Sequence, residues 1–332
     1  MGFISIKENL GIPKYRQIVS SIEKALVDGT LKKGDSLPSV NGIRTKFSLS
    51  RDTVLKAFNE LKVRGIVQSI AGKGYYIKSE NVKISQKIFL LFDELNSFKE
   101  DLYNSFLNGL ESNMQVDIFF HHFNFEVFSK LIYDNIGNYN YYVIMPANLK
   151  NTDKVIEKLP PENVFILDQT HPELSQYSGI YQNFEKDMIA GLTNINAHLI
   201  KYAKLILLFQ EEKQPQKMLK GFKEFCKITK FDHEIINSFQ NRIPKIGEVY
   251  LIPDDRNLIL LLKKIKEEKL KLGIEIGIIS FNDTLLKEIV EGGITTISTD
   301  FNKMGERLAQ MILNKEQLKI ENPSVLIWRN SL

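Results

Sequence analysis

Two short amphipathic helices with only residues 48–50 between them constrain the fold of this chain more than any other feature. Ser39 and Ser50 can each cap one helix, because a serine oxygen accepts a hydrogen bond from a backbone N–H of the first turn. The apolar positions at helical spacing are Val40, Ile43 and Phe47, then Val54, Phe58 and Leu61. This spacing predicts a helix-turn-helix in which the start of the second helix faces DNA base edges.

A β-hairpin is predicted directly after the second helix. Gly65 can end that helix in a left-handed conformation, and residues 66–70 and 75–77 then alternate with a period of two around the turn at residues 72–74. A helix-turn-helix followed by a hairpin with a basic tip is a winged helix. A small helical subdomain with a solvated hairpin is the alternative interpretation of the same pattern.

The distribution of charge favours the winged helix. Residues 1–80 hold 14 Lys and Arg against 7 Asp and Glu, whereas residues 81–332 hold 30 against 33. A basic first quarter on a slightly acidic remainder predicts that a polyanion contacts only the front of the chain. The single Cys226 excludes an internal disulfide framework, and no apolar run approaches the ~18 residues that span a bilayer. We therefore expect a cytoplasmic protein with no membrane partner and a buried, inert thiol.

Residues 12–77 resemble the winged-helix domain of GntR-type bacterial transcription regulators. The resemblance rests on three stretches, IPKYRQIVSSIEKALVDGTLKKGDSLPSV, SRDTVLKAFNELKVRGIV and GKGYYI. It implies that Arg51, in the Ser-Arg pair that opens the second helix, contacts DNA. Asn41 and Leu55 stand where arginines are usual, so other basic residues are expected to replace those contacts. The residues expected at the DNA are Ser39, Asn41, Arg44, Lys46, Ser50, Arg51, Thr53, Lys56, Gly72, Lys73, Gly74 and Tyr75.

Strands and helices alternate through the rest of the chain, after a polar linker at residues 79–86. Strands are expected at 88–92, 116–120, 142–145, 164–167, 204–208, 249–252, 275–280 and 295–298. Helical patterns lie between them at 99–112, 126–135, 152–159, 185–202, 216–227, 256–271, 283–291 and 303–313. This alternation predicts an α/β fold with parallel sheets covered on both faces, and its length favours two doubly wound lobes.

The same region resembles the sugar-sensing domain of LacI/GalR-type repressors. The resemblance rests on the order of FILD at 165–168, NFEKD at 183–187, Gly221-Phe222, IPDD at 252–255, IISFND at 278–283, TTISTD at 295–300 and WRNS at 328–331. It implies a periplasmic-binding-protein-like fold of two lobes, three crossovers and a ligand cleft. The expected domains are a winged-helix head at 1–78, the linker at 79–86 and an effector-binding and dimerisation domain at 87–332. Lobe 1 is expected at about 87–182 and 300–318, and lobe 2 at about 183–299 and 319–332.

Ligands of open α/β sheets bind beyond the carboxyl ends of the strands. This rule and the resemblance together select effector-binding residues, in which Asp, Asn and Gln bond hydroxyl groups and phenylalanines form a flat apolar wall. The resemblance alone implies sugar contacts at Asp168, Asp254, Asn282 and Thr299, and Met218 replaces an arginine of that family. The full set is Asp93, Asn96, Ser97, Phe98, Asp168, Gln169, Met218, Asp254, Phe281, Asn282 and Thr299.

Some of these residues also have a structural interpretation. Asp254 or Asp255 can cap the helix that begins near Arg256, and Asp283 can cap the next one. His121 and His122 follow a predicted strand, and we interpret them as a solvent-facing pair rather than a zinc site. No catalytic set, Gly-rich phosphate loop or nucleophile elbow is present in the sequence, so no catalytic residue, metal or cofactor is expected.

The sequence thus predicts a ligand-responsive transcription regulator that binds a palindromic operator as a homodimer. We expect a repressor of a carbohydrate-utilisation operon whose effector is a monosaccharide or derivative. Two alternatives stay open: a solute-binding module with only nonspecific DNA affinity, and an α/β enzyme with a DNA-binding regulatory head.

Overall fold

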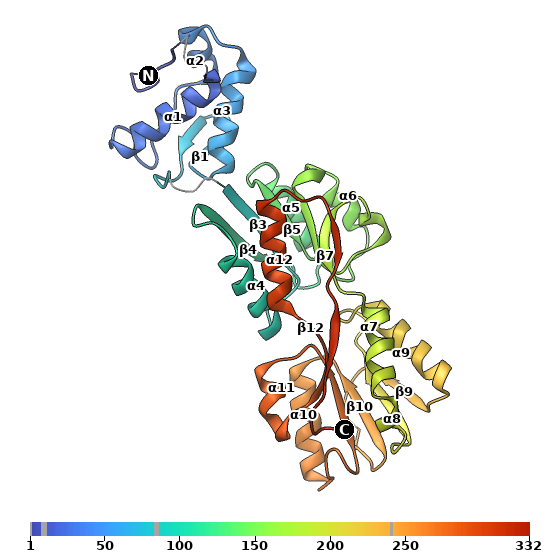
Figure 1. Cartoon of the computed structure of the whole chain (residues 1–332). Helices are drawn as coiled ribbons and strands as arrows, with labels where there is room; N and C mark the ends of the chain where they lie inside the picture. Colours follow the sequence, from blue (N-terminus) through green and yellow to red (C-terminus); the bar gives the residue numbers. More distant parts are fainter. Residues whose placement is uncertain (1, 8–11, 83–85, 240–241) are drawn as a thin grey trace.

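The computed structural model describes residues 2–7, 12–82, 86–239 and 242–332, which form a small head, a middle lobe and a distal lobe in a row (Figure 1). Of the predicted linker at 79–86, residues 83–85 lie outside the described residues. The middle and distal lobes are lobe 1 and lobe 2 below. The predicted fold class, a winged helix-turn-helix joined to a two-lobed α/β domain with doubly wound sheets, is confirmed.

The head is a winged helix built on one apolar core. Helix α1 packs on the second helix of the helix-turn-helix, and Ile18, Ile22, Ile43 and Phe58 are fully buried in the core of the head. The wing is an antiparallel hairpin in which Val67 pairs with Ile77. The elements are α1 (Lys14–Val27), α2 (Val40–Phe47), α3 (Arg51–Val63), β1 (Val67–Ile70) and β2 (Gly74–Ile77).

Lobe 1 is a six-stranded parallel sheet with the strand order β13-β7-β6-β5-β3-β4. Alternate residues of β3 face opposite cores, so that Leu90 packs under α4 and α12 while Leu91 packs under α5 and α6. The elements are β3 (Gln86–Phe92), α4 (Ser97–Asn108), β4 (Met114–Phe120), α5 (Phe125–Asn135), β5 (Tyr141–Ile144), α6 (Thr152–Ile156), β6 (Val164–Asp168), β7 (Ser178–Tyr181), α12 (Phe301–Leu313) and β13 (Lys319–Glu321), with 3-10 turns at Pro161–Asn163 and Pro172–Leu174.

Lobe 2 repeats this plan with the strand order β14-β12-β11-β10-β8-β9, of which only β14 runs antiparallel to its neighbour. Helices α7 and α9 cover one face and α10 covers the other. The elements are α7 (Phe184–Asn194), α8 (Asn196–Leu199), β8 (Lys204–Leu208), α9 (Gln216–Thr229), β9 (His233–Ile236), β10 (Glu248–Ile252), α10 (Asp255–Glu267), β11 (Gly277–Phe281), α11 (Leu285–Ile289), β12 (Thr295–Thr299) and β14 (Ser324–Ile327), with a 3-10 turn at Val290–Gly292.

The chain crosses between the lobes after β7, after β12 and after β13. The expected boundary of the last crossover is wrong. Residues 319–321 were expected in lobe 2, but they pair with residues 179–181 of β7 as an edge strand of lobe 1. The chain therefore passes to lobe 2 after Glu321. This boundary was mispredicted because the pairing with β7 is a tertiary contact that no local sequence pattern indicates. No helix within the described ranges is long and apolar enough to cross a bilayer.

Candidate nucleic-acid interface and ligand cleft

The N-terminal turn of α3 is exposed and fixed by its cap. Ser50 Oγ accepts a hydrogen bond of 3.1 Å from the backbone N–H of Thr53, as the sequence predicts. Arg51 and Asp52 are exposed in this turn, and Lys56 one turn later lies with its ammonium 4.4 Å from the centre of the Tyr15 ring. A rigid, capped helix start with a free basic side chain is the form in which winged helices present residues to a DNA groove.

Helix α2, the first of the helix-turn-helix, and the wing place the other predicted DNA residues on the surface of the head. Ser39 Oγ accepts a hydrogen bond of 3.0 Å from Gly42 N–H, and Asn41, Arg44, Lys46 and Lys73 are exposed. The wing turn uses left-handed backbone at Gly72 and Gly74, with φ of +72° and +103°. Tyr75 differs from the others because it is half-buried, with its ring 4.6 Å from that of Phe58. It supports the wing from inside the core.

A cleft of about 830 Å³ opens between the two lobes. All the predicted effector residues except Thr299 line it. Those residues are Asp93, Asn96, Ser97, Phe98, Asp168, Gln169, Met218, Asp254, Phe281 and Asn282. They belong to loops at the carboxyl ends of parallel strands and to the helix starts that follow them, where open α/β sheets bind ligands; that they contact an effector stays a prediction.

The wall from lobe 1 is organised by a buried ion pair. Asp93 follows β3, and its carboxylate is bonded by the ammonium of Lys99 and by the backbone N–H of Glu94 at 2.6 Å. Asn96 caps α4 through Lys99 N–H at 3.2 Å. The ring of Phe98 packs 4.7 Å from that of Phe301 and forms an apolar part of the wall.

A second buried carboxylate in the same wall has no cation of its own among the described contacts. Asp168 ends β6 with a left-handed backbone, φ +72°, and accepts a hydrogen bond of 2.5 Å from the side-chain amide of Gln182. Burial raises the pKa of Asp168 to about 6, against the opposing effect of the Lys99 charge. The side-chain oxygen of Gln182 is buried without a partner in the part of the chain that the structure describes.

The wall from lobe 2 presents a matching acceptor. Asn282 follows β11 with φ +62°, and its side-chain oxygen is also buried and unbonded within the described residues. Asp254 caps α10 by accepting a hydrogen bond of 2.9 Å from Asn257 N–H, so its predicted structural role is confirmed while its carboxylate still lines the cleft. Phe281 and Phe184 pack with their rings 6.0 Å apart.

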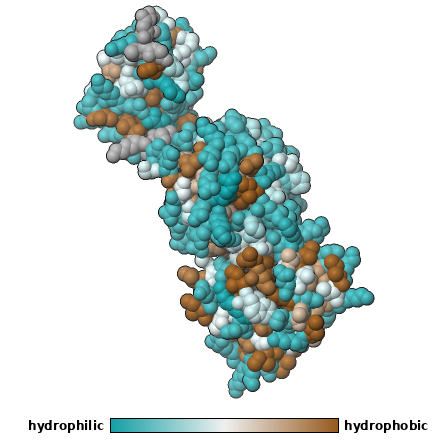
Figure 2. Space-filling view, in the orientation of Figure 1, coloured by the Kyte–Doolittle hydropathy of each residue, from teal (hydrophilic) through white to brown (hydrophobic). Residues whose placement is uncertain are grey.

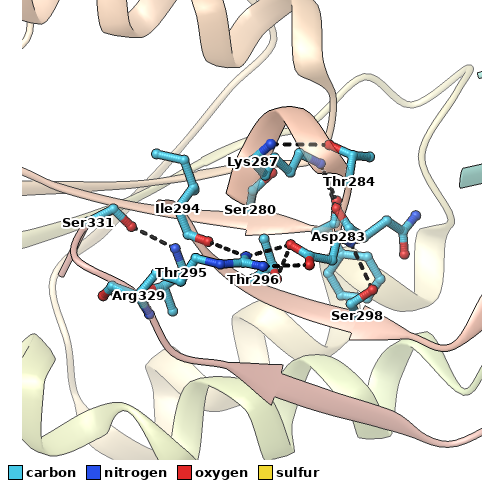
Figure 3. Close-up of polar contacts among 12 residues, drawn as sticks. Ser280, Asp283, Thr284, Lys287, Ile294, Thr295, Thr296, Ser298, Arg329 and Ser331 are labelled. Carbon is cyan, nitrogen blue, oxygen red and sulfur yellow. Dashed lines mark hydrogen bonds and ion pairs between the residues drawn. The ribbon is translucent and has the colours of Figure 1, made fainter. Parts of the chain in front are cut away.

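A polar network around the backbone of Asn282 lies behind this wall, and Figure 3 labels its members Lys287, Asp283 and Arg329. The fully buried Lys287 donates to the carbonyl oxygens of Phe281 at 2.9 Å and Asn282 at 2.6 Å, and pairs with Asp255 at 3.1 Å. Asp283 accepts from Arg329 at 2.6 and 2.8 Å. Burial alone would raise the pKa of Asp283, but the hydrogen bonds from Arg329 and Thr296 hold it below its usual value.

Direct contacts also join the two lobes across the cleft mouth. The Asn148 side chain of lobe 1 donates to the carbonyl oxygens of Gln214 at 2.5 Å and Glu211 at 3.1 Å in lobe 2. The ammonium of Lys213 lies 3.8 Å from the Glu94 carboxylate. The segment of lobe 2 between β8 and α9 thus touches lobe 1, and it contributes Gln210, Lys213 and Gln214 to the cleft lining.

Three predictions about individual residues are wrong. Thr299 is not among the cleft-lining residues: it ends β12 at a crossover, pairs with Ser324 of β14, and its hydroxyl donates to Pro323 O at 3.1 Å. His121 is fully buried, its Nε2 lies 3.0 Å from Met145 O, and burial lowers its pKa; only His122 is exposed. Thr284, not Asp283, caps α11. Cys226 is buried as expected, and burial raises the pKa of its thiol to about 12.

Several cleft residues were not predicted. Gln182 was missed because β7, whose carboxyl end it follows, was not recognised in the sequence. The charged residues Lys99, Lys213, Arg256 and Lys264 were missed because helix and loop lysines resemble ordinary solvated residues in a sequence. No group of three metal-ligating side chains occurs in the described ranges.

Comparison with protein families gives two matches. Residues 14–77 match bacterial regulatory proteins of the gntR family, and residues 201–332 match a periplasmic binding protein-like domain. The chain is 40% identical over 90 residues to the mannosyl-D-glycerate transport/metabolism system repressor MngR of Escherichia coli, a match that covers 27% of this chain and 35% of that protein. It is 31% identical over 114 residues to the transcriptional repressor YtrA of Bacillus subtilis, with 34% of this chain and 84% of that protein covered.

One relative matches along nearly the whole chain. The arabinose metabolism transcriptional repressor of Geobacillus stearothermophilus is 23% identical over 363 residues, which cover 97% of this chain and 96% of that protein. Among solved structures, a LacI family transcriptional regulator from Silicibacter pomeroyi has a TM-score of 0.63 at 15% identity, over 74% of this chain and 98% of that one. The lac repressor dimer bound to operator and an anti-inducer has a TM-score of 0.61 at 14% identity, over 74% and 92%.

Proposed function

Since the chain belongs to the gntR family of bacterial regulatory proteins and joins that head to a periplasmic binding protein-like domain, we propose that it is a sugar-responsive transcriptional repressor. The head at residues 1–78 would bind operator DNA, the linker at 79–86 would connect it, and residues 87–332 would bind the effector and form a dimer. The protein would act in the cytoplasm and catalyse no reaction.

One observation carries this proposal: an exposed basic helix start and an acceptor-lined cleft occur in the same chain. Gln182 and Asn282 line the cleft from opposite lobes, and their buried side-chain oxygens have no partner among the described residues. Because a buried acceptor without a donor costs about 1–3 kcal/mol, a ligand rich in O–H donors would recover that cost. Such a ligand would bridge the lobes and stabilise the closed form.

The effector that best fits these groups is a neutral polyhydroxy compound. Phe98 and Phe281 supply the flat apolar surface against which a sugar ring packs, and Asp168 and Asp254 supply further acceptors. The names of two relatives, the repressors of arabinose metabolism and of mannosyl-D-glycerate transport, support a carbohydrate. Since the thioether of Met218 donates no hydrogen bond and accepts only weakly, we propose that this side chain contributes mainly packing.

Dimer formation is proposed on lobe 2. Hydrophobic residues gather on its visible face, including the left edge where Figure 1 places α11 (Figure 2). Leu285 and Ile289 of α11 are 78% and 76% exposed, and Ile259 of α10 is 49% exposed. Leu285 and Ile289 lie one helical turn apart, and adjacent exposed apolar side chains that form a patch are typical of a protein interface. A second copy would place two heads on the two halves of a palindromic operator.

A ligand screen tests the effector half of the proposal. The sequence contains one tryptophan, Trp328, whose ring lies 4.2 Å from that of His198 and next to Arg329, the partner of Asp283. We expect a monosaccharide or a derivative to raise the thermal midpoint and to change Trp328 fluorescence, because a ligand that binds only the folded state stabilises it. Turnover of that compound would instead support an α/β enzyme. Failure of every neutral sugar and sugar phosphate to do either would contradict the proposal.

A further inference from the structure

The end of α3 rests directly on lobe 1. Gly65 follows α3 with φ +71°, and a Cβ atom at this position would lie 3.1 Å from Cδ and 3.4 Å from Nζ of Lys87. Lys87 is the second residue of β3, and Figure 1 shows the lower end of α3 beside the start of that strand. The positive φ favours a glycine here, and an added Cβ atom would also press against the lysine side chain.

Lobe 1 alone determines where Lys87 lies. Its backbone N–H donates to the Asn140 side chain at 2.8 Å, and its carbonyl accepts from Asn140 N–H at 2.8 Å. Its ammonium pairs with Asp117 at 2.8 Å and lies 4.8 Å from the centre of the Tyr139 ring. Tyr139 in turn donates to Asp117 at 2.8 Å. The side chain is only 10% exposed, so its methylene groups form a fixed surface rather than a mobile one.

The residue before Gly65 ties the same helix end to the rest of the head and to the linker. Arg64 bonds the Glu23 carboxylate of α1 and donates to the carbonyl oxygen of Val82 at 3.2 Å. Its side chain is 11% exposed. Arg64 and Gly65, which directly follow α3, therefore contact the linker and lobe 1, while Arg51 lies at the other end of α3. We call α3 the recognition helix below, because its start is the part predicted to enter the DNA groove.

We propose that Lys87 is a positioning residue that seats the recognition helix on lobe 1 and holds the head in one orientation. The strand that carries Lys87 at its start ends at Phe92, next to the cleft residue Asp93. The sheet of lobe 1 therefore connects the head at one edge to the cleft at the other. A movement of this sheet when the cleft closes turns the head with it. Only this last consequence rests on the proposed function.

Distance measurements between two spin labels test this contact between Lys87 and the end of α3, called the seat below, without DNA or effector. We attach the labels at Asn59→Cys on α3 and Lys130→Cys on α5, both exposed, in a Cys226→Ala background. The chain with Lys87 intact is expected to give one narrow distance distribution. Lys87→Ala is expected to broaden it towards the spread of about 15 Å that a free tether of the length of residues 79–86 samples.

Three further variants make the outcome decisive. Lys87→Arg is expected to keep the narrow distribution, because its stem and charge can replace those of lysine. Lys158→Ala is the matched control, since Lys158 is exposed and pairs with its neighbour Glu157. Lys87→Ala could lower the thermal midpoint of residues 87–332, and in that case Gly65→Ala tests the same contact from the head side. Gly65→Ala is also expected to broaden the distance distribution.

Two results would overturn the seat. A distribution that is already broad with Lys87 intact would show that the head is free, and one that stays narrow in both Lys87→Ala and Gly65→Ala would show that other contacts hold it. Either result would leave the proposed DNA and sugar binding untouched, because neither ligand takes part in the measurement.

Discussion

At the scale of single residues, the cleft is characterised by polar groups that the protein buries without fully bonding them. Asp168 receives one hydrogen bond from Gln182, and the oxygens of Gln182 and Asn282 receive none within the described residues. Folded proteins bond nearly all their buried polar atoms, and other exceptions among these residues, such as the hydroxyl groups of Ser129 and Tyr202, lie away from the cleft. The oxygens of Gln182 and Asn282 belong to residues that line it, so a ligand bound there could complete their bonding. The neighbouring pair of Asp93 and Lys99 shows the contrast, because there the protein supplies the partner itself.

Asp168 should make the stability of the free protein depend on pH. Its pKa is raised from 3.8 to about 6 on folding, so the folded state binds the proton more tightly than the unfolded state. The stabilising effect is therefore complete below pH 3.8 and is lost as the pH rises through 6. Asp168→Asn should remove this dependence, and its free energy of unfolding at pH 7.5 should exceed that of the native chain by about 3 kcal/mol. Urea unfolding of both proteins at pH 5 and 7.5 measures this effect. An equal difference in unfolding free energy between variant and native chain at both pH values would contradict the prediction.

Asn282→Gly should separate ligand binding from stability. The glycine accepts φ +62° and keeps the carbonyl that Lys287 bonds, but it lacks the unbonded side-chain oxygen. We expect the affinity for the stabilising sugar, measured by calorimetry, to fall by about 1–3 kcal/mol, while operator binding is kept. Lys315→Gly is the control, because Lys315 is exposed with φ +53° and does not line the cleft. Unchanged sugar affinity would remove Asn282 from the site.

Arg51→Ala should act at the other end of the molecule. Loss of an arginine from the start of the recognition helix should weaken operator binding by about 1–3 kcal/mol and leave sugar binding intact. Fluorescence anisotropy with labelled DNA measures the change. Lys303→Ala removes the same charge from an exposed position on lobe 1 and should have no effect. Equal losses in both variants would show that only total charge matters.

At the scale of elements, each lobe contains one pair of helices that pack closely at a glycine. In lobe 1, a Cβ atom on Gly305 of α12 would lie 2.4 Å from Leu102 O of α4. In lobe 2, one on Gly221 of α9 would lie 2.6 Å from Glu185 O of α7. Because the obstacle is backbone in both cases, the helices can pack this closely only without a side chain there.

Gly305→Ala should therefore destabilise lobe 1. The added methyl group must push α12 away from α4, and overpacking of this kind costs about 1–3 kcal/mol of unfolding free energy. Gln310→Ala on the exposed side of α12 is the control. Urea unfolding measures both variants. A gain of about 1 kcal/mol for Gly305→Ala, as at an exposed helical glycine, would contradict the close packing.

The sequence predicted elements with strong internal patterns and missed those that depend on tertiary contacts. The eight predicted strands between residues 86 and 332 are all present, because each is a short run rich in apolar or β-branched residues; all except β4 are mostly buried. The strands β7, β9, β13 and β14 were missed since they are short and lie beyond the central strands of their sheets. The same limit explains which cleft residues were predicted and which were missed. Asp93, Asp168 and Asn282 follow recognised strands and were found, whereas Gln182 follows β7 and was not.

At the scale of the whole molecule, three bodies form a row in which lobe 1 lies between the head and lobe 2 (Figure 1). Lobe 1 contacts the head at the start of β3 and forms the cleft at the end of it. A ligand that draws lobe 2 towards lobe 1 can therefore affect DNA binding only through a change in lobe 1 or in the spacing of two heads in a dimer. Such a ligand must bind one arrangement of the lobes more tightly than the other.

The dimer should depend on α11. Leu285→Glu with Ile289→Glu places two charges on its exposed apolar face and should prevent association without affecting the fold. Sedimentation velocity measures the oligomeric state, and we expect a dimer for the native chain and a monomer for this variant. The control is Ile200→Glu at an equally exposed position on the other side of lobe 2. An unchanged dimer would place the interface elsewhere.

The most direct test of the account is the affinity of the full chain for DNA from the region upstream of its own gene, compared with a shuffled sequence at physiological salt. We predict that the upstream fragment binds about 10³-fold or more tightly than the shuffled one, and that the sugar found in the thermal screen reduces this difference. Equal affinity for the two fragments, or a difference that no cleft ligand changes, would contradict the account.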